Sequence, residues 1–183
     1  MLPRIQPIAP TRIQAPFDDP DFVWELKHDG FRALAYVESR SCRLISRKQI
    51  QYKSFPGLSQ ALAGLRVHNA ILDGEIVSLG SDGRSQFMDL MRRRTRDALY
   101  YVFDLLWLDG QDLRPLPLLD RKAALRQILK LSRVPALLYA DHVEGIGTSF
   151  YKAVCARDCE GVVGKHRNRP YGAPRSWCHV PIS

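Results

Sequence analysis

The sequence of 183 residues has no apolar run near the roughly 20 residues that a membrane-spanning helix needs. Its first residues, MLPRIQPIAPTRIQAPF, also lack the continuous apolar stretch and the small-residue cleavage site of a secretory signal peptide. We therefore expect no membrane segment and a cytoplasmic location for this protein.

Cysteine is scarce as well. The four cysteines, at positions 42, 155, 159 and 178, form none of the paired CxxC patterns that usually hold zinc. We expect reduced thiols, and a metal site at Cys155, Cys159 and Cys178 is the weaker alternative.

Acidic residues are outnumbered by basic ones, 19 against 27, which gives a net charge of +8 and an isoelectric point near 9.6. Nucleic acid is the natural partner for such a chain, because each neutralised phosphate releases condensed counterions. Arginines cluster at Arg92, Arg93, Arg94 and Arg96. This cluster has two open interpretations, a solvated helix face and a patch that contacts phosphates.

The length suits one domain, and the pattern of apolar residues predicts short strands that alternate with helices. The first 20 residues carry five prolines and predict an irregular surface lead-in, with order beginning near Phe22. Strands are expected at 31–37, 42–46, 71–79, 100–108, 137–140 and 161–165, the first two as an antiparallel hairpin. Helices are expected at 58–65, around 87–91, at 121–131 with Asp120 as its cap, and around 148–157.

The sharpest local feature is the segment 25–32, ELKHDGFR, which brings a lysine, carboxylates and an arginine together. A nucleophilic lysine needs a partly deprotonated amine, and burial or nearby positive charge favours that form. The simpler interpretation is that Lys27 pairs with Asp29 or Glu25 on a solvent-facing turn.

Two more segments carry charges inside apolar strands. Asp73 and Glu75 interrupt LDGEIV, and Glu160 and Lys165 bracket the apolar run in EGVVGK. Charges in buried strands are costly unless they are paired or bind a ligand. We therefore expect these segments and residues 25–32 to share one cleft.

Together these segments resemble the covalent nucleotidyltransferase superfamily, which contains ATP-dependent DNA ligases, RNA ligases and messenger RNA capping enzymes. Lys27-His28-Asp29-Gly30 matches its KxDG signature, and Arg32 stands where the family keeps an arginine. The later motifs match, in order, at Ser46-Arg47-Lys48, Asp73-Gly74-Glu75, Phe103-Asp104 and Glu160-Gly161-Val162-Val163. An ordered set is far more specific than KxDG alone, and the chain is most similar to bacterial ligases of the end-joining type.

The resemblance implies an α+β nucleotidyltransferase fold, with mainly antiparallel sheets flanked by helices around an ATP cleft. Lys27 would attack the α-phosphate of ATP and become joined to AMP, for joining nicks or ends of duplex DNA in repair and recombination. The implied ATP-binding residues are Glu25, Lys27, Arg32, Arg47, Glu75, Phe103 and Lys165. Magnesium would be held by Glu75 and Glu160, Glu25 would hold the adenine, Phe103 would stack on it, and Lys165 would approach the α-phosphate.

The last motif departs from the family pattern. It reads Trp177-Cys178-His179-Val180-Pro181, with His179 and Pro181 where the family has two lysines directed at the phosphates of ATP. The resemblance also implies an OB-fold domain beyond residue 183, so we expect residues 1–183 to be a single adenylation domain. Nick sealing would then need an OB-fold or end-joining partner in trans.

Three functions are weighed. The ordered motifs favour an adenylating enzyme of the DNA ligase class. The altered last motif favours a degenerate paralogue that binds ATP or nucleic acid without sealing. The third is an RNA ligase or a capping enzyme that uses GTP. It is disfavoured, because the motifs are most similar to those of bacterial DNA ligases.

Overall fold

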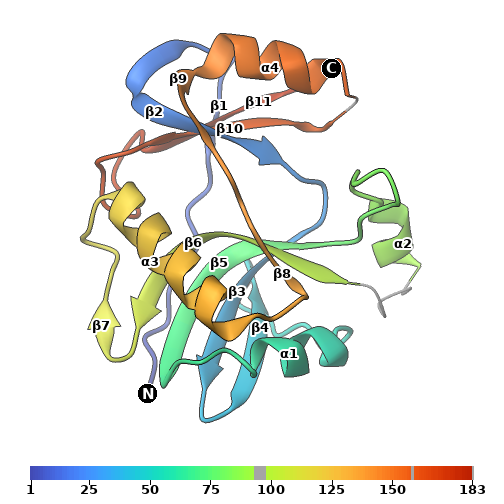
Figure 1. Ribbon diagram of the computed structural model, residues 1–183, viewed down its shortest axis with the longest axis vertical. Coiled ribbons are helices and arrows are strands. Elements are labelled where there is room, and N and C mark those ends of the chain that lie inside the picture. The colour runs from blue at the N-terminus through green and yellow to red at the C-terminus, as the bar shows by residue number, and fades with distance from the viewer. Residues whose placement is uncertain (93–97, 158, 183) are drawn as a thin grey trace.

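The computed structural model describes residues 1–92, 98–157 and 159–182, and they fold into two sheets with helices on their outer sides (Figure 1). The first sheet has the strand order β1, β11, β10, β2, β9. The second runs β4, β3, β5, β6, β7, and β8 pairs with β6 outside that path. All pairings are antiparallel except β1 with β11 and β6 with β8. The expected α+β class with mainly antiparallel sheets is confirmed.

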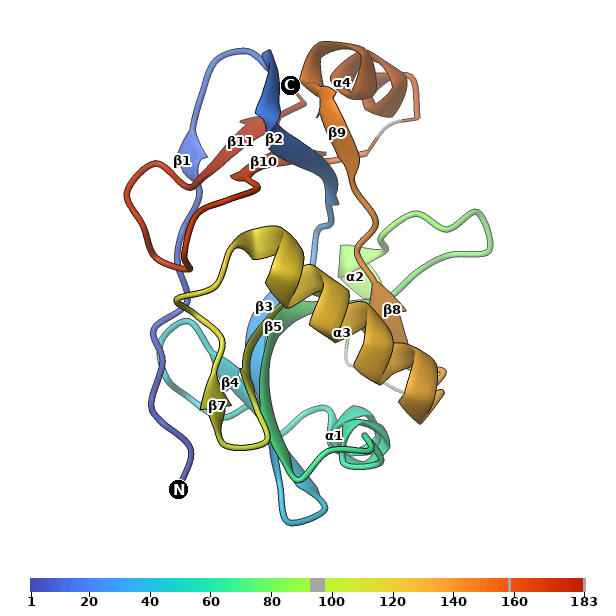
Figure 2. The same ribbon diagram turned by 60° about the vertical axis from the view of Figure 1, so that its left-hand side comes forward.

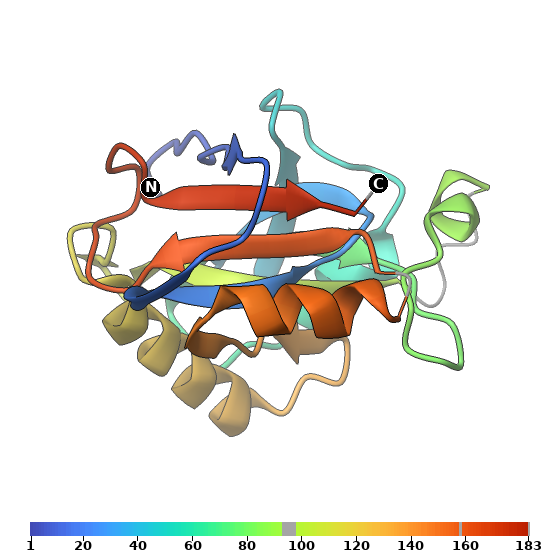
Figure 3. The ribbon, with the colours of Figure 1, turned by 90° about the horizontal axis from the view of Figure 1, so that it is seen from above.

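The first sheet consists of β1 (Thr11–Arg12), β2 (Asp18–Lys27), β9 (Val143–Ile146), β10 (Gly161–His166) and β11 (Trp177–Pro181). Helix α4 (Gly147–Cys155) packs on its outer side, as Figure 3 shows from above. Trp24, Val154 and Val162 are the buried centre of this layer.

The second sheet consists of β3 (Phe31–Glu38), β4 (Ser41–Ser46), β5 (Asn69–Val77), β6 (Leu99–Leu108), β7 (Gln111–Asp112) and β8 (Leu137–Tyr139). Helices α1 (Pro56–Leu62) and α3 (Leu118–Ser132) cover it, and α3 lies across the strands in Figure 2. The short α2 (Phe87–Met91) projects to one side. No helix among the described residues is long and apolar enough to cross a membrane.

Strand β3 shows why the second sheet is central. Successive side chains of a strand point to opposite faces, and here both faces are covered. Ala33, Ala35 and Val37 enter the core beneath α1 and α3, whereas Leu34 and Tyr36 pack with Ile5 and other residues on the other side. The predicted β3–β4 hairpin is confirmed, and both residues of its turn have positive φ, as a tight hairpin requires.

Several predictions were wrong at their boundaries. The N-terminal lead-in is not simply a surface segment, because β1 lies within it, β2 begins at Asp18 rather than Phe22, and Ile5 is buried. Asp120 does not cap α3: the helix begins at Leu118, after Pro117, and Asp120 lies in its first turn. There its negative charge still favours the helix N-terminus.

Other elements differ in extent or were missed. The predicted 71–79 strand is β5 at 69–77, the 58–65 helix is α1 at 56–62, and the 148–157 helix ends at Cys155. Strands β7, β9 and β11 were not predicted, because each has only two to five residues and too little sequence pattern to mark a strand.

Candidate functional site

A pocket of about 400 Å³ lies between the two sheets. That volume falls in the range of small-molecule sites, roughly 300–1,000 Å³. Strands β2, β10 and β11 form one wall, and β3, β5 and β6 form the other. All the ATP-binding residues predicted from the sequence line it, namely Glu25, Lys27, Arg32, Arg47, Glu75, Phe103 and Lys165. Glu160 lines an adjacent pocket of about 290 Å³, which shares Lys27 with the first.

Strand geometry places these side chains. Residues two apart on a strand share a face, so Glu25 and Lys27 both reach the pocket from β2. On β6 the register jumps from Asp104 opposite Asp73 to Val102 opposite Gly74, which leaves Phe103 as the extra residue of a β-bulge. Bulges re-aim side chains, and Phe103 enters the pocket from this one.

Lys27 forms an ion pair with Glu160, which directly precedes β10. The simpler interpretation, in which Lys27 pairs with Asp29 or Glu25, is therefore wrong. Gly30 lets the chain leave Lys27 close to β5, because a Cβ at that position would collide with the carbonyl oxygen of Ile76. The side chain of Lys27 is 26% exposed and lines the pocket.

Glu25 is held by two buried lysines. Its Oε1 accepts a hydrogen bond from Lys122 of α3, and its Oε2 accepts one of 2.6 Å from Lys165 of β10. Burial would raise the pKa of Glu25, but the positive charges of Lys122 and Lys165 outweigh it and lower the pKa below its usual value. Burial lowers the pKa of Lys165 to about 8, and Lys122 adds to that lowering while Glu25 opposes it.

Arg32 is fixed by the first carboxylate of the DGE motif. Its Nε and Nη2 donate hydrogen bonds of 2.6 and 2.7 Å to Asp73, and the hydroxyl of Tyr171 donates another of 2.6 Å to the same carboxylate. Burial lowers the pKa of Arg32, but the charge of Asp73 outweighs this and the net shift is upward. The guanidinium lies 4.9 Å from the ring centre of Phe103. Arg32 is thus a fixed positive charge at an aromatic surface.

The other carboxylate of that motif, Glu75, has no ion-pair partner among the described residues and faces the pocket. Its pKa is raised to about 8, mainly by burial, with the charges of Arg32 and Lys27 opposing the rise and the charge of Glu160 adding to it. Among the described residues no group of three or more His, Cys, Asp and Glu side chains is arranged to hold a metal ion. Magnesium commonly uses only one or two protein carboxylates together with substrate phosphates and water, and Glu75 with Glu160 fits that smaller donor set.

Two histidines also line the pocket. His28 shares a hydrogen bond of 2.9 Å with Ser85 through Nδ1, and its ring packs edge-on against Tyr101. Burial lowers the pKa of His28 to about 4, so it is neutral near pH 7. The Nδ1 atom of His179 is buried without a hydrogen-bond partner among the described residues. Burial, followed by the charges of Lys27 and Arg12, lowers the pKa of His179.

Sequence reasoning missed Lys122, Tyr101 and Trp177, whose ring lines the pocket and packs edge-on against Phe103. A signal for Lys122 was present: it stands between Leu118 and Leu125 on the apolar face of α3, where a lysine is unusual. The arginine cluster is only partly described, since Arg93, Arg94 and Arg96 lie outside the described residues.

Comparison with known proteins agrees with this geometry. A family model described as "ATP dependent DNA ligase domain" matches residues 7–179. The multifunctional non-homologous end joining protein LigD of Pseudomonas aeruginosa is 32% identical over 161 residues, and the match covers 85% of this chain and 19% of that protein. The SPbeta prophage-derived DNA ligase-like protein LigB of Bacillus subtilis is 29% identical, with 91% of this chain and 62% of that protein covered.

Among solved structures, the chain is similar to a mycobacterial DNA ligase D complexed with ATP and MES. The TM-score is 0.78 with 28% sequence identity, and the match covers 96% of this chain and 59% of that one. This chain therefore spans less than two thirds of the length of each of these relatives.

Proposed function

This chain belongs to the ATP-dependent DNA ligase domain family, and from that premise we propose that it reacts with ATP to form a covalent lysyl-AMP adduct at Lys27. One observation carries the proposal. Lys27 and Lys165 line the same pocket as Arg32 and the ring of Phe103, so a reactive amine, cations for phosphates and a surface for a base are brought together.

In the proposed step the free amine of Lys27 attacks the α-phosphorus of ATP. A P–N bond forms while the bond from that phosphorus to the bridging oxygen breaks, and pyrophosphate leaves with the electron pair. Glu160 accepts a hydrogen bond from Lys27 and is the adjacent acceptor for the proton that the ammonium group must lose. This is covalent catalysis by an amine.

The other residues bind and orient the nucleotide. Phe103 stacks on the adenine and Glu25 accepts from its amino group, while Arg32 and Arg47 contact the ribose or the phosphates. Lys165 stabilises the charge that develops on the α-phosphate, because a fixed cation in a buried site acts more strongly than one in water. Phosphoryl transfer depends mainly on such positioning and charge.

Glu75 and Glu160 would hold magnesium, which neutralises phosphate charge when bound. With a pKa near 8, Glu75 needs a nearby cation to be fully ionised at neutral pH.

Residues 1–183 act as one adenylation domain in this proposal, and nicked or broken duplex DNA receives the AMP. Its role would be DNA repair and recombination by end joining, with sealing completed by an OB-fold or end-joining partner in trans. LigD of Pseudomonas aeruginosa is named as an end-joining protein, which supports that role. The second candidate, a degenerate paralogue, is favoured by His179 and Pro181 in the last motif.

Incubation with magnesium and α-labelled ATP, followed by a denaturing gel and intact mass, tests the proposal. We expect a gain of one AMP in the wild type and in Lys53→Ala, an exposed-lysine control, but none in Lys27→Ala. Labelling that persists without Lys27 contradicts the assigned nucleophile. Labelling by GTP in place of ATP supports the capping-type alternative, and no adduct in any variant supports the degenerate paralogue.

A further inference from the structure

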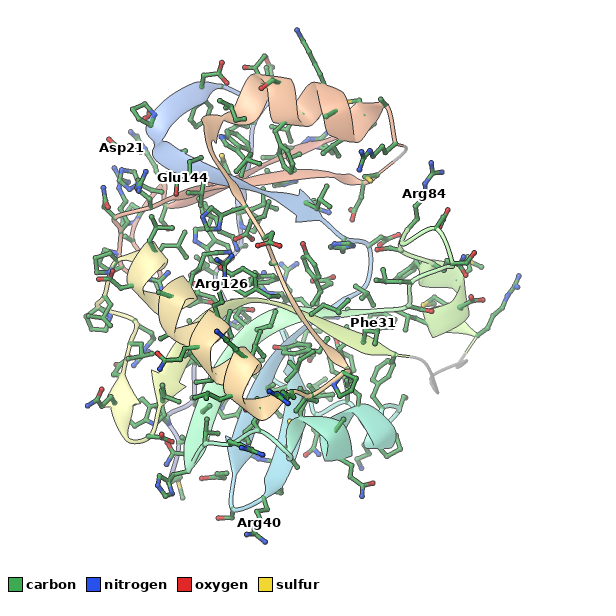
Figure 4. The ribbon with its side chains drawn as sticks, in the orientation of Figure 1. Asp21, Phe31, Arg40, Arg84, Arg126 and Glu144 are labelled. Carbon is green, nitrogen blue, oxygen red and sulfur yellow. The ribbon has the colours of Figure 1, made fainter. Side chains whose placement is uncertain are left out.

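A buried lysine stands behind the pocket without lining it. Lys122 is 1% exposed, and its Nζ donates to Glu25 and, at 2.8 Å, to the carbonyl oxygen of Ala140. It also lies 5.0 Å from the ring centre of Tyr139. Arg126, one turn further along α3, is largely exposed (Figure 4). Helix α3 therefore directs Lys122 into the interior and Arg126 toward solvent.

The charges around Lys122 do not cancel. Lys122 and Lys165 carry two positive charges and Glu25 carries one negative charge, which leaves one positive charge in a buried cluster. The neighbouring buried ions are paired one to one, Arg32 with Asp73 and Arg121 with Asp104. Because an uncompensated buried charge is costly, the cluster favours an anion. Of the two lysines in the cluster, only Lys165 lines the pocket, so it is the one that can offer its positive charge to an anion there.

The amine of Lys165 lies between Glu25 and the aromatic wall of the pocket. At present Nζ donates to Glu25 while it lies 4.0 Å from the ring centre of Trp177 and 4.2 Å from that of Phe103. If Lys165 moves to a phosphate, Glu25 keeps a cation only because Lys122 holds its other oxygen. Without Lys122, the departure of Lys165 would leave Glu25 as a buried carboxylate with no cation beside it, even when the adenine amino group donates to it.

We propose that Lys122 is a positioning residue that keeps Glu25 neutralised from behind, so that Lys165 can leave Glu25 and contact the α-phosphate of ATP. This inference rests on the proposed function. It assigns Lys122 no contact with the nucleotide. Its effect passes through Glu25, so removal of Glu25 should remove most of the effect of Lys122.

The test compares Lys122→Met, Lys122→Arg and the control Lys130→Met, which removes an exposed lysine from the same helix. The rate of lysyl-AMP formation is measured against ATP concentration and pH. We expect Lys122→Met to lower the maximal rate by about tenfold to a hundredfold, the range for loss of one charged hydrogen bond in the transition state. Lys122→Arg should recover most of the rate, and Lys130→Met should match the wild type.

The pH profile distinguishes positioning from loss of structure. The charged groups that act on Lys165 are Glu25, Lys122 and Asp104, and Lys122 is the one that lowers its pKa. Without Lys122 the alkaline limb of the rate profile, where Lys165 loses its proton, should move to higher pH. A lower rate with an unmoved limb overturns the proposal, as does a Lys122→Met rate equal to that of Lys130→Met.

A double-mutant cycle keeps the proposal testable if Lys122→Met folds poorly. In a Glu25→Gln background no carboxylate needs Lys122, so Lys122→Met should cost less than about threefold there. An equal loss in both backgrounds contradicts a role through Glu25.

Binding of α,β-methylene-ATP, read from tryptophan fluorescence, separates this inference from the proposed function. No adduct in the wild type contradicts the lysyl-AMP proposal. In that case Lys122→Met must still weaken analogue binding by about tenfold, and unchanged binding overturns the role of Lys122.

Discussion

Arg121 of α3 holds Asp104 of β6 with two hydrogen bonds, from Nε to Oδ1 at 2.8 Å and from Nη2 to Oδ2 at 2.9 Å. Both side chains are fully buried. Arg121 also donates through Nη1 to the carbonyl oxygens of Leu116 and Arg169. The pair thus ties the covering helix to the strand that carries Phe103. It also explains the charge that interrupts the apolar run of β6.

Breaking this pair should destabilise the protein strongly. We expect Arg121→Met to lower the free energy of unfolding by about 3–5 kcal/mol, because Asp104 is left buried and unpaired. The double variant Arg121→Met with Asp104→Leu should lose less, since it leaves no uncompensated charge. Denaturant unfolding checks both values, and a single variant as stable as the double would contradict a buried ion pair.

Glu75 should make stability depend on pH. Its pKa is raised from 4.5 to about 8 in the folded protein, so the folded state retains a proton that the unfolded state has lost. Stability from this group is therefore fully present below about pH 4.5 and declines as pH rises to about 8, by up to a few kcal/mol.

Glu75→Gln removes that decline, so this variant should gain stability relative to the wild type between pH 5 and pH 8, roughly the window of the shift. Melting temperatures of ligand-free protein measure the effect, with Glu38→Gln as a control on the surface. A constant difference between wild type and Glu75→Gln across that range would show that Glu75 ionises normally.

His179→Lys should speed adenylation. The histidine lines the pocket with a lowered pKa and supplies no fixed charge there. A lysine would add one beside the phosphates, and we expect a gain of about tenfold in the rate of adduct formation. His68→Lys, which adds the same charge at an exposed site outside the pocket, should leave the rate unchanged. Equal rates for both variants would mean that position 179 does not face the phosphates.

Binding to nicked duplex DNA should weaken steeply as salt rises, because the chain carries a net charge of +8. If the arginine cluster contacts phosphates, Arg92→Gln with Arg94→Gln should reduce the slope of log affinity against log salt by up to about 1.8, roughly 0.9 per contact. The matched pair Arg40→Gln with Arg66→Gln tests general charge, since both residues lie outside the pocket and Arg40 lies at one tip of the molecule (Figure 4). Equal effects of the two pairs would favour a merely solvated cluster.

The sequence alone determined which segments carry the site. KxDG, DGE and EGVV each place their charges within a few consecutive residues, and alternation along a strand decides which of those residues share a face. The β3–β4 hairpin and the expectation of one shared cleft followed from such local patterns, whereas the α+β class was implied by the resemblance to the nucleotidyltransferase superfamily. Several boundaries differed, because β1 and β9 form by pairing with strands far away in the chain.

Only the tertiary structure decided how the charges pair. Lys27 and Glu160 are 133 positions apart, and Lys122 and Glu25 are 97 apart. No spacing rule links such residues, since a buried ion finds its partner through the packing of whole strands and helices. The same packing makes Phe103 a bulge residue, buries Glu75 enough to raise its pKa, and turns a lysine on the apolar face of α3 toward the back of the pocket between the sheets. The sequence determined the motifs, because their residues are consecutive. Only the tertiary structure decided the pKa and the partner of each charge, because both depend on burial.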